Sequence, residues 1–278
     1  TRMAFKLLNC THRHCVFTID EELRHFFLED RSLLNCLFRA VQSVILRMFN
    51  KMNQSQNFVP GFICVLHTFG RPLEWNPHIH CILSEGGFSD NAIWRPVKHF
   101  NYTYLRNAFQ TALLTEMEQH IGPSFKKIKA YIYHKDKNGF YVYAKPNLCD
   151  PNTVIKYIGR YLGRPVIALK RIDSYDGENV TFHYNRHEDN AYVKRTIPAI
   201  EFIKLLIQHI PEKHFKMIRY YGLYARHRKI DAKLYRAIHQ SKHRFIKGFT
   251  KWRQDILLSF GYDPLFCPCL LYTSPSPR

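Results

Sequence analysis

The sequence predicts an α+β fold in which an antiparallel sheet is covered by helices on at least one face. Apolar runs of strand length occur at 14–19, 62–69, 78–84 and 140–145. Segments with helical periodicity lie between them, and a Gly70-Arg71-Pro72 turn joins two of the runs as a hairpin. With 278 residues, 46% of them hydrophobic, the chain can bury one large core or two modest ones.

The first half of the chain supplies most of the predicted sheet. After strand 14–19, acidic residues from Asp20 onward suit the positive N-terminal end of a helix. A second helical stripe runs over 33–48. Pro60-Gly61 opens the buried strand 62–69, and its hairpin partner begins with His78-Ile79-His80.

Helices and turns dominate the middle of the chain. A helix is predicted over 104–120, with its apolar stripe in the core. Asn138-Gly139 is a turn signal before strand 140–145. Asp150-Pro151 is a helix start, and Gly163 is a C-cap, so a helix is expected over 152–162.

The last part of the chain predicts a hairpin followed by helices. Asp176-Gly177 is the expected turn, with arms at 166–172 and 180–184. A helix is expected over 197–210, and a basic, tyrosine-rich helical segment over 217–229. These elements could extend a DNA-binding surface or form a plain helical subdomain with a solvated basic face.

The composition indicates a polyanionic partner. Lys and Arg number 41 against 22 Asp and Glu, which gives a net charge of +19, and such an excess is typical of nucleic-acid-binding proteins. We expect no membrane association, since no apolar run is long enough to span a bilayer. Isolated cysteines in apolar settings predict reduced thiols and a cytoplasmic protein. No glycine-rich phosphate loop is present, so no nucleotide cofactor is expected.

Two histidines alternate on the predicted strand 78–84. Because alternate strand side chains share a face, His78 and His80 point the same way and could hold one metal ion together. Taken alone, the pattern fits a half-buried strand with two hydrogen-bonded histidines better.

Two tyrosines lie one above the other on the predicted helix 152–162. Tyr157 and Tyr161 are spaced i, i+4. A phenol with a pKa of about 10 is a poor nucleophile alone, but a metal can polarise a phosphate, and nearby cations can stabilise the developing charge. The alternative is that both tyrosines merely pack or stack. The cations around the pair are Lys156, Arg160 and Arg164.

Taken in order, these motifs resemble the two-tyrosine HUH transposases of rolling-circle insertion sequences, the insertion-sequence-91 type. The resemblance covers roughly residues 7 to 266. It is carried by Leu7-Leu8-Asn9-Cys10-Thr11-His12-Arg13-His14 through Phe17-Thr18-Ile19, His67-Thr68-Phe69-Gly70, Trp75-Asn76-Pro77-His78-Ile79-His80, Tyr141-Val142-Tyr143-Ala144-Lys145-Pro146, Tyr157-Ile158-Gly159-Arg160-Tyr161 and Ile218-Arg219-Tyr220-Tyr221-Gly222-Leu223-Tyr224-Ala225.

The resemblance implies an HUH-nuclease fold, with the tyrosine helix packed across a central His-x-His strand. It implies that His78 and His80 hold Mg²⁺ or Mn²⁺. Tyr157 and Tyr161 would then cleave and rejoin single-stranded DNA at transposon ends and target through 5′-phosphotyrosine links. We expect the cations Lys156, Arg160, Arg164, Arg219 and Arg226 to contact DNA.

A hard octahedral ion needs more than two imidazoles, so a third side chain is expected. Glu74 and His67 are candidates because they lie near the hairpin, and Asn152 is a candidate near the tyrosine helix. The sequence does not decide among them.

The division expected from the sequence is an HUH core at 1–165, a hairpin and basic helical region at 166–268, and a tail at 269–278. Members of the family usually carry a cysteine-rich zinc module before the core, so the chain is expected to be truncated at both ends. The tail matches a translated sequencing adapter and is expected to be non-native. Cys10 and Cys15 are expected to be structural residues and not a separate zinc site.

Two alternatives to a transposase remain open. Rolling-circle replication initiators and relaxases use similar histidine and tyrosine sets, and a transposase remnant could bind DNA without activity. Under the transposase interpretation, host replication proteins are possible partners, and the protein would be associated with the nucleoid.

Overall fold

A six-stranded sheet forms the centre of the protein, in the order β5-β1-β3-β2-β9 with β4 also paired to β3. The computed structural model describes residues 10–52, 58–89, 94–97, 100–144, 165–186 and 189–225, and some positions between 253 and 273. All printed pairings in the sheet are antiparallel, which confirms the predicted fold class. The strands are β1 His12–Phe17, β2 Val59–Phe69, β3 Trp75–Phe88, β4 Trp94–Pro96, β5 Val142–Tyr143 and β9 Ile218–Gly222.

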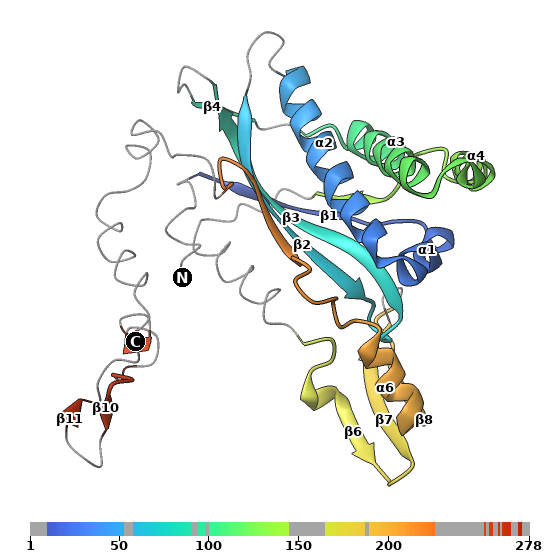
Figure 1. Cartoon of the computed structure of the whole chain (residues 1–278), viewed down its shortest axis with the longest axis vertical. Helices are drawn as coiled ribbons and strands as arrows, with labels where there is room; N and C mark the ends of the chain where they lie inside the picture. Colours follow the sequence, from blue (N-terminus) through green and yellow to red (C-terminus); the bar gives the residue numbers. More distant parts are fainter. Residues whose placement is uncertain are drawn as a thin grey trace.

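Helices cover one side of this sheet (Figure 1). Two helix starts are fixed by aspartates, because Asp20 accepts from the Glu22 N–H at 2.8 Å and Asp30 accepts from the Ser32 N–H at 2.9 Å. The helices are η1 Glu21–Leu23, α1 Arg24–Glu29, η2 Arg31–Leu33, α2 Leu34–Met52, α3 Tyr102–Ile121, η3 Pro123–Phe125 and α4 Lys126–Lys135.

The two faces of the sheet have different roles. Residues directly opposite each other in antiparallel strands share a face, and Phe17, opposite Ile79, lies in the main core beneath the helices. The alternate residues of β3, His78 and His80, therefore lie on the other face. We call this side the histidine face. The strand that carries both histidines is central, as predicted.

One helical segment is apolar enough to cross a membrane by length and composition. Among the described residues this is Arg31–Met52, and 61% of its most apolar window is buried inside the structure. Its inward side chains, such as Leu37, Val41 and Ile45, lie in the main core. The core helix of a soluble protein passes the same test, so this segment is weak evidence for a membrane.

A smaller three-stranded sheet follows and packs against one helix. Its strands are β6 Ile172–Tyr175, β7 Asn179–Asn185 and β8 Tyr192–Pro198, and the helix is α6 Ala199–Ile207. The turn predicted at Asp176-Gly177 is confirmed, since the Asp176 carboxylate accepts from the N–H groups of Glu178 and Asn179.

Two predicted element boundaries in this region were wrong. The first hairpin arm does not run over 166–172, because a short helix, η4 Leu169–Arg171, precedes β6. The predicted helix 197–210 begins only at Ala199, since the two preceding residues complete β8 opposite β7. Proline at 198 donates no hydrogen bond and ends the strand.

The helical prediction for 217–229 was also wrong where the structure describes it. Residues Ile218–Gly222 form β9, which pairs with β2. Gly222 has φ +56°, and a Cβ there would lie 1.9 Å from the Pro60 carbonyl oxygen, so only glycine fits this approach. The central sheet therefore contains a strand from each side of residue 165, while the domain division itself stays a prediction.

Smaller differences concern sheet edges. The basic segment 94–97 supplies β4, and the strand predicted at 140–145 is reduced to β5 among its described residues. Phe266–Cys267 and Tyr272–Thr273 pair as β10 and β11. The origin of the 269–278 tail stays a prediction. The predicted helix 152–162 lies outside the described residues.

Candidate metal centre

Three histidines meet on the histidine face. His67, His78 and His80 each offer a ring nitrogen, and these nitrogens all lie within 4.8 Å of one another. The strand register produces this meeting: His67 on β2 lies directly opposite His78 on β3, and His80 follows two residues later on the same face. We call these three residues the histidine triad, and such a group can hold one metal ion.

Hydrogen bonding fixes the orientation of His78. Its Nδ1 lies 2.7 Å from the backbone oxygen of Asn76, and because a carbonyl only accepts, Nδ1 carries the proton. The Nε2 lone pair of His78 is thereby directed at Nε2 of His80, 3.1 Å away. Two ligands at right angles around an ion with bonds of about 2.1 Å are about 3.0 Å apart. The pair therefore fits two neighbouring positions of one octahedral ion.

A fourth histidine, His14, is hydrogen-bonded to a member of the group. Nε2 of His14 on β1 lies 3.0 Å from Nδ1 of His80, and the two rings are parallel within 1°. Without metal, His14 can donate to His80, and His80 can donate through Nε2 to His78. With a metal bound, His80 would donate from Nδ1 to His14 and would offer its Nε2 lone pair to the ion. A shift of tautomers thus prepares the site without any ring rotation.

Burial favours the neutral form of His78 and of His14. Desolvation lowers the pKa of His78, and it lowers the pKa of His14 to about 4. A neutral imidazole is the form that binds metal, so the buried environment favours ligation at neutral pH.

The structure distinguishes among the three candidate third ligands. His67 completes the group. Glu74 is half exposed, and its carboxylate lies 3.8 Å from Arg24, outside the group. Asn152 lies outside the described residues. His14 was not among the predicted site residues, although the alternation His12-Arg13-His14 repeats the pattern of the metal strand.

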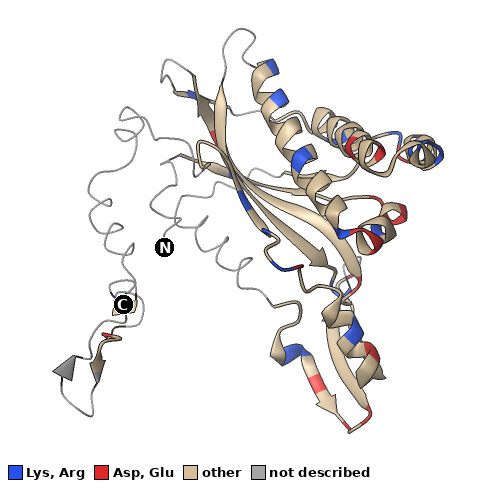
Figure 2. Ribbon diagram, in the orientation of Figure 1, with Lys and Arg blue, Asp and Glu red and all other residues tan. Residues whose placement is uncertain are grey.

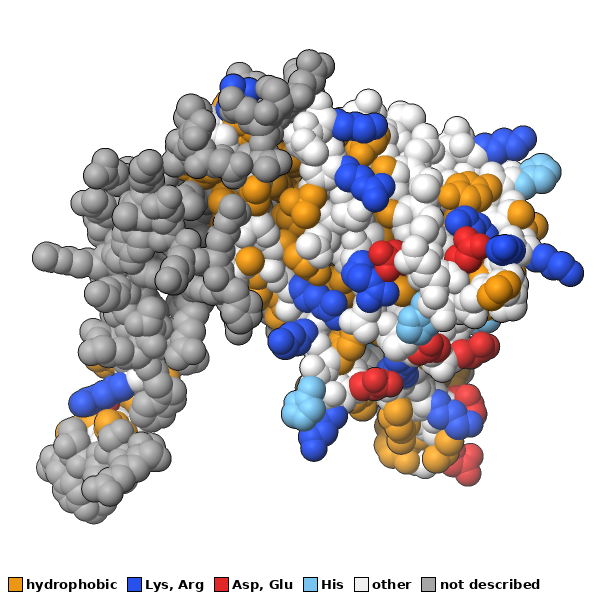
Figure 3. All heavy atoms as spheres, turned by 45° about the horizontal axis from the view of Figure 1, so that its top comes forward, with side chains coloured by type: hydrophobic (Ala, Val, Ile, Leu, Met, Phe, Trp, Pro, Cys, Tyr) orange, Lys and Arg blue, Asp and Glu red, His pale blue; other side chains and the backbone are white. Residues whose placement is uncertain are grey.

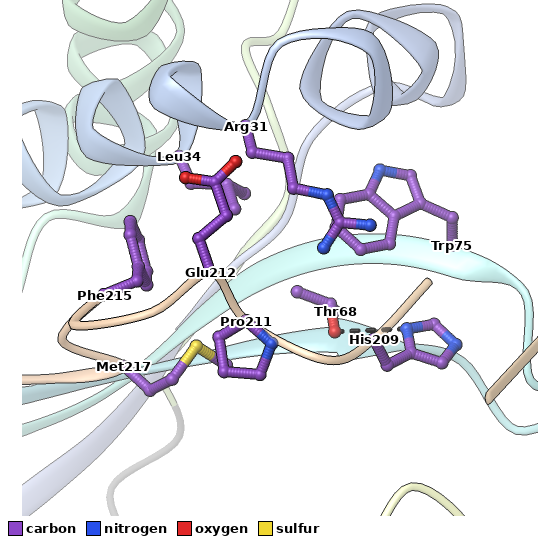
Figure 4. A pocket seen from close by; sticks show the side chains of 9 residues that line it. All are labelled: Arg31, Leu34, Thr68, Trp75, His209, Pro211, Glu212, Phe215 and Met217. Atoms are coloured by element: carbon purple, nitrogen blue, oxygen red, sulfur yellow. Dashed lines mark hydrogen bonds between the residues drawn. The ribbon is translucent and has the colours of Figure 1, made fainter. Parts of the chain in front are cut away.

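A small enclosed pocket lies beside the β2–β3 hairpin (Figure 4). Thr68 follows His67, and its hydroxyl is hydrogen-bonded to Nδ1 of His209 at 3.1 Å across this pocket. The Trp75 indole N–H donates to the Arg24 backbone oxygen at 3.0 Å. The cavity holds about 10 Å³, room for about one water at most. We therefore assign it to support of the hairpin and not to substrate binding.

Arg219, a predicted DNA contact, is on the opposite side of the sheet from the triad. It lies opposite Cys64, a residue of the helix-covered core. Its guanidinium is hydrogen-bonded to Asn35 and lies 3.9 Å from the Phe38 ring centroid. The structure does not bring Arg219 to the histidine face, and its DNA contact stays a prediction that this geometry does not favour.

The other predicted residues cannot be placed. Tyr157, Tyr161, Lys156, Arg160, Arg164 and Arg226 lie outside the described residues. On the described parts, α1 and α3 carry both basic and acidic residues, whereas α2 and α4 carry Lys and Arg without Asp or Glu, as Figure 2 shows. The space-filling view shows basic side chains scattered and not gathered in one patch (Figure 3).

Comparisons with known proteins point to one family. The family model described as "Putative transposase" (Y2_Tnp) matches residues 61–231, which include the triad. The transposase for insertion sequence element IS801 of Pseudomonas savastanoi pv. phaseolicola is 28% identical over 233 residues, covering 79% of this chain and 56% of the relative. "Putative transposase y4qJ" of Sinorhizobium fredii (strain NBRC 101917 / NGR234) is 30% identical over 237 residues, covering 78% and 59%.

The chain thus spans somewhat more than half the length of these two relatives. No solved structure matches it.

Proposed function

Because this chain belongs to the Y2 transposase family, of the IS801 and IS91 type, we propose that it cleaves and rejoins single-stranded DNA through 5′-phosphotyrosine links in rolling-circle transposition. The observation that carries this proposal is the histidine triad on two paired strands of the central sheet, within the span that matches the family. In this proposal the DNA partners are transposon ends and target. Host replication proteins would supply new strand at the nucleoid.

The triad would position a scissile phosphate. His67, His78 and His80 would hold Mg²⁺ or Mn²⁺, with phosphate and water oxygens as the remaining ligands of an octahedral ion. When bound, the ion supplies Lewis-acid polarisation of the phosphate. The chain's own contribution is orientation: Asn76 fixes the tautomer of His78, and His14 fixes that of His80.

Tyr157 and Tyr161 are the proposed nucleophiles. The phenolic oxygen of one attacks phosphorus, the bond to the 3′-oxygen breaks, and that oxygen takes up a proton to leave as a 3′-OH. A free 3′-OH later attacks the phosphotyrosine and returns the proton to tyrosine, so the strand is rejoined without a nucleotide triphosphate. The support for these roles is the Tyr-x-x-x-Tyr spacing, with Lys156, Arg160 and Arg164 available to stabilise the charge on the phosphate.

The test is formation of a covalent protein–DNA adduct. The full chain is incubated with single-stranded oligonucleotides from the element's ends, with Mn²⁺ or with EDTA, and analysed on a denaturing gel. We expect a slower band with Mn²⁺ alone, and its loss in the Tyr157→Phe, Tyr161→Phe double variant. Tyr220→Phe, on β9, serves as the matched tyrosine control.

The outcomes separate the alternative functions. Binding without an adduct on authentic end sequences would favour a DNA-binding remnant. An adduct that forms only on plasmid or phage origins would favour a replication initiator or relaxase. An adduct that persists in EDTA would exclude the triad from the reaction.

His14 gives a test of the supporting network. Replacing it with phenylalanine removes the acceptor for Nδ1–H of His80, and removal of such a supporting group typically weakens metal affinity by about 10- to 100-fold. Isothermal titration with Mn²⁺ measures the change. His14→Gln, which keeps an acceptor, should recover much of the affinity. Equal losses in both variants would show that His14 acts only through packing.

A further inference from the structure

A cleft of about 320 Å³ opens at the edge of the central sheet, where β1 ends and β5 begins. Small-molecule sites in proteins start at about 300 Å³, so the cleft can hold a group as large as a nucleobase. Side chains from the end of β1, from α1 and α3, and from the loop after α4 line it. Those used below are Thr18, Asp20, Arg24, Arg106, Asp136 and Tyr141.

The strand register places the sheet edge of this cleft two strands from the metal strand, while α1 and α3, which also line it, lie over the face opposite the triad. Phe17 on β1 lies opposite Ile79, the residue between His78 and His80. The next residue, Thr18, lines the cleft and donates from its N–H (3.2 Å) and its hydroxyl (2.9 Å) to the Tyr141 backbone oxygen. Two strand spacings, about 10 Å, therefore separate the metal strand from Tyr141. One or two nucleotides of an extended strand cover this distance.

Tyr141 offers a stacking surface in the cleft. Tyr141 is 56% exposed, which is high for a large aromatic residue. The Arg106 guanidinium lies 5.2 Å from the ring centroid, so a cation–π contact fixes the orientation of the ring. A fixed, accessible aromatic ring next to a cation is the arrangement on which single-stranded DNA bases stack.

The remaining lining groups can read the edge of a base. The carboxyls of Asp20 and Asp136 provide acceptors, and Asp20 is itself held by Lys135 at 3.0 Å. The guanidinium groups of Arg24 and Arg106 also line the cleft, so donors stand beside these acceptors. Acceptors next to donors match an amino group next to ring acceptors, as on cytosine, whereas thymine presents a carbonyl in place of the amino group.

We propose that this cleft holds one unpaired nucleobase with an exocyclic amino group, stacked on Tyr141, and so sets the position of the DNA strand relative to the triad. The inference rests on the proposed function and deepens it: the triad would hold the phosphate, while the cleft would select the nucleotide one or two positions away.

The test measures binding without cleavage. Fluorescein-labelled twelve-nucleotide strands of cytidine or of thymidine are titrated with the full chain in EDTA, and anisotropy is followed. We expect tighter binding of the cytidine strand. Tyr141→Ala should weaken that binding by about tenfold, the value of one base–aromatic stack, and Tyr141→Phe should not. Asp136→Ala should remove the preference for cytidine.

A matched control is Tyr175→Ala, because Tyr175 is exposed to a similar extent, 62%, but lies on β6 of the smaller sheet. It should bind both strands as the unaltered chain does. A strand containing 2-aminopurine adds a second readout, since stacking on Tyr141 quenches its fluorescence, and Tyr141→Ala should abolish the quenching.

Two negative results have different meanings. If the unaltered chain binds the strands and Tyr141→Ala binds them equally well, the cleft proposal is overturned and the proposed function stands. If the unaltered chain binds no single strand at all, both fail.

Discussion

Replacing His78 and His80 with alanine is expected to abolish Mn²⁺ binding by the full chain, and with it the metal-dependent DNA adduct. The two Nε2 atoms lie 3.1 Å apart, and together they supply two of the three nitrogens of the group. Loss of supporting groups alone costs up to about 100-fold in affinity, so loss of two ligands should exceed that value. Isothermal titration measures the affinity directly.

Thermal unfolding provides a second measurement of the same loss. An ion that binds only the folded state stabilises it by about 2.7 kcal/mol at one hundred times its dissociation constant. Mn²⁺ should therefore raise the unfolding temperature of the unaltered chain and not that of the double variant. Equal shifts in both proteins would place the ion elsewhere.

Two further variants test which histidines bind Mn²⁺. His183→Ala removes a histidine of the smaller sheet, paired with Asp173 at 2.7 Å, and should leave Mn²⁺ binding unchanged. His67→Ala alone tests the third ligand. An affinity unchanged by His67→Ala would return that role to a residue outside the described part of the chain.

The metal strand could be predicted because its information is local. Alternation in His78-Ile79-His80 fixes the face of each side chain, and the short Gly70-Arg71-Pro72 turn makes the hairpin the simplest arrangement. Local spacing does not contain the register between β2 and β3. That register makes His67 the third member of the group. From the sequence alone, Glu74 and Asn152 were equally good candidates for the third ligand.

The error at β9 has a similar origin. Arg219, Tyr220 and Tyr221 fit a basic, tyrosine-rich helix as well as a strand, since aromatic residues occur in both. What selects the strand is pairing with β2, about 155 residues earlier, including the close approach of Gly222 to Pro60. Such a contact has no signature in the local sequence.

The role of His14 also depends on a distant strand. Its alternation with His12 shows that both side chains share one face of β1. Only the pairing of β1 with β3 places the His14 ring against His80. The burial that favours the neutral form of these rings also makes the folded protein less stable in acid.

Stability should fall as the pH drops from about 6.5 towards 4. Burial lowers the pKa of His12 and the pKa of His14 to about 4, from a usual value of 6.5. Above pH 6.5 both are neutral in the folded and the unfolded chain. Below it the unfolded chain binds protons that the folded chain does not bind. Each histidine can therefore lower the free energy of unfolding by about 3 kcal/mol by the time the pH reaches 4.

Urea midpoints at about pH 7.5, 6 and 5 measure how the free energy of unfolding changes with pH. A midpoint that stays constant over this range would contradict the prediction.

His12→Phe isolates one of the two groups. His12 is fully buried and hydrogen-bonded to the Tyr224 hydroxyl at 2.5 Å, so its replacement should lower the free energy of unfolding by about 1–3 kcal/mol at every pH by removing that buried hydrogen bond. It also removes one proton-linked penalty, because phenylalanine cannot titrate. The variant should therefore be less stable than the unaltered chain at neutral pH and lose less on acidification. The reduced slope, and not the stability at any single pH, identifies the buried imidazole as the cause.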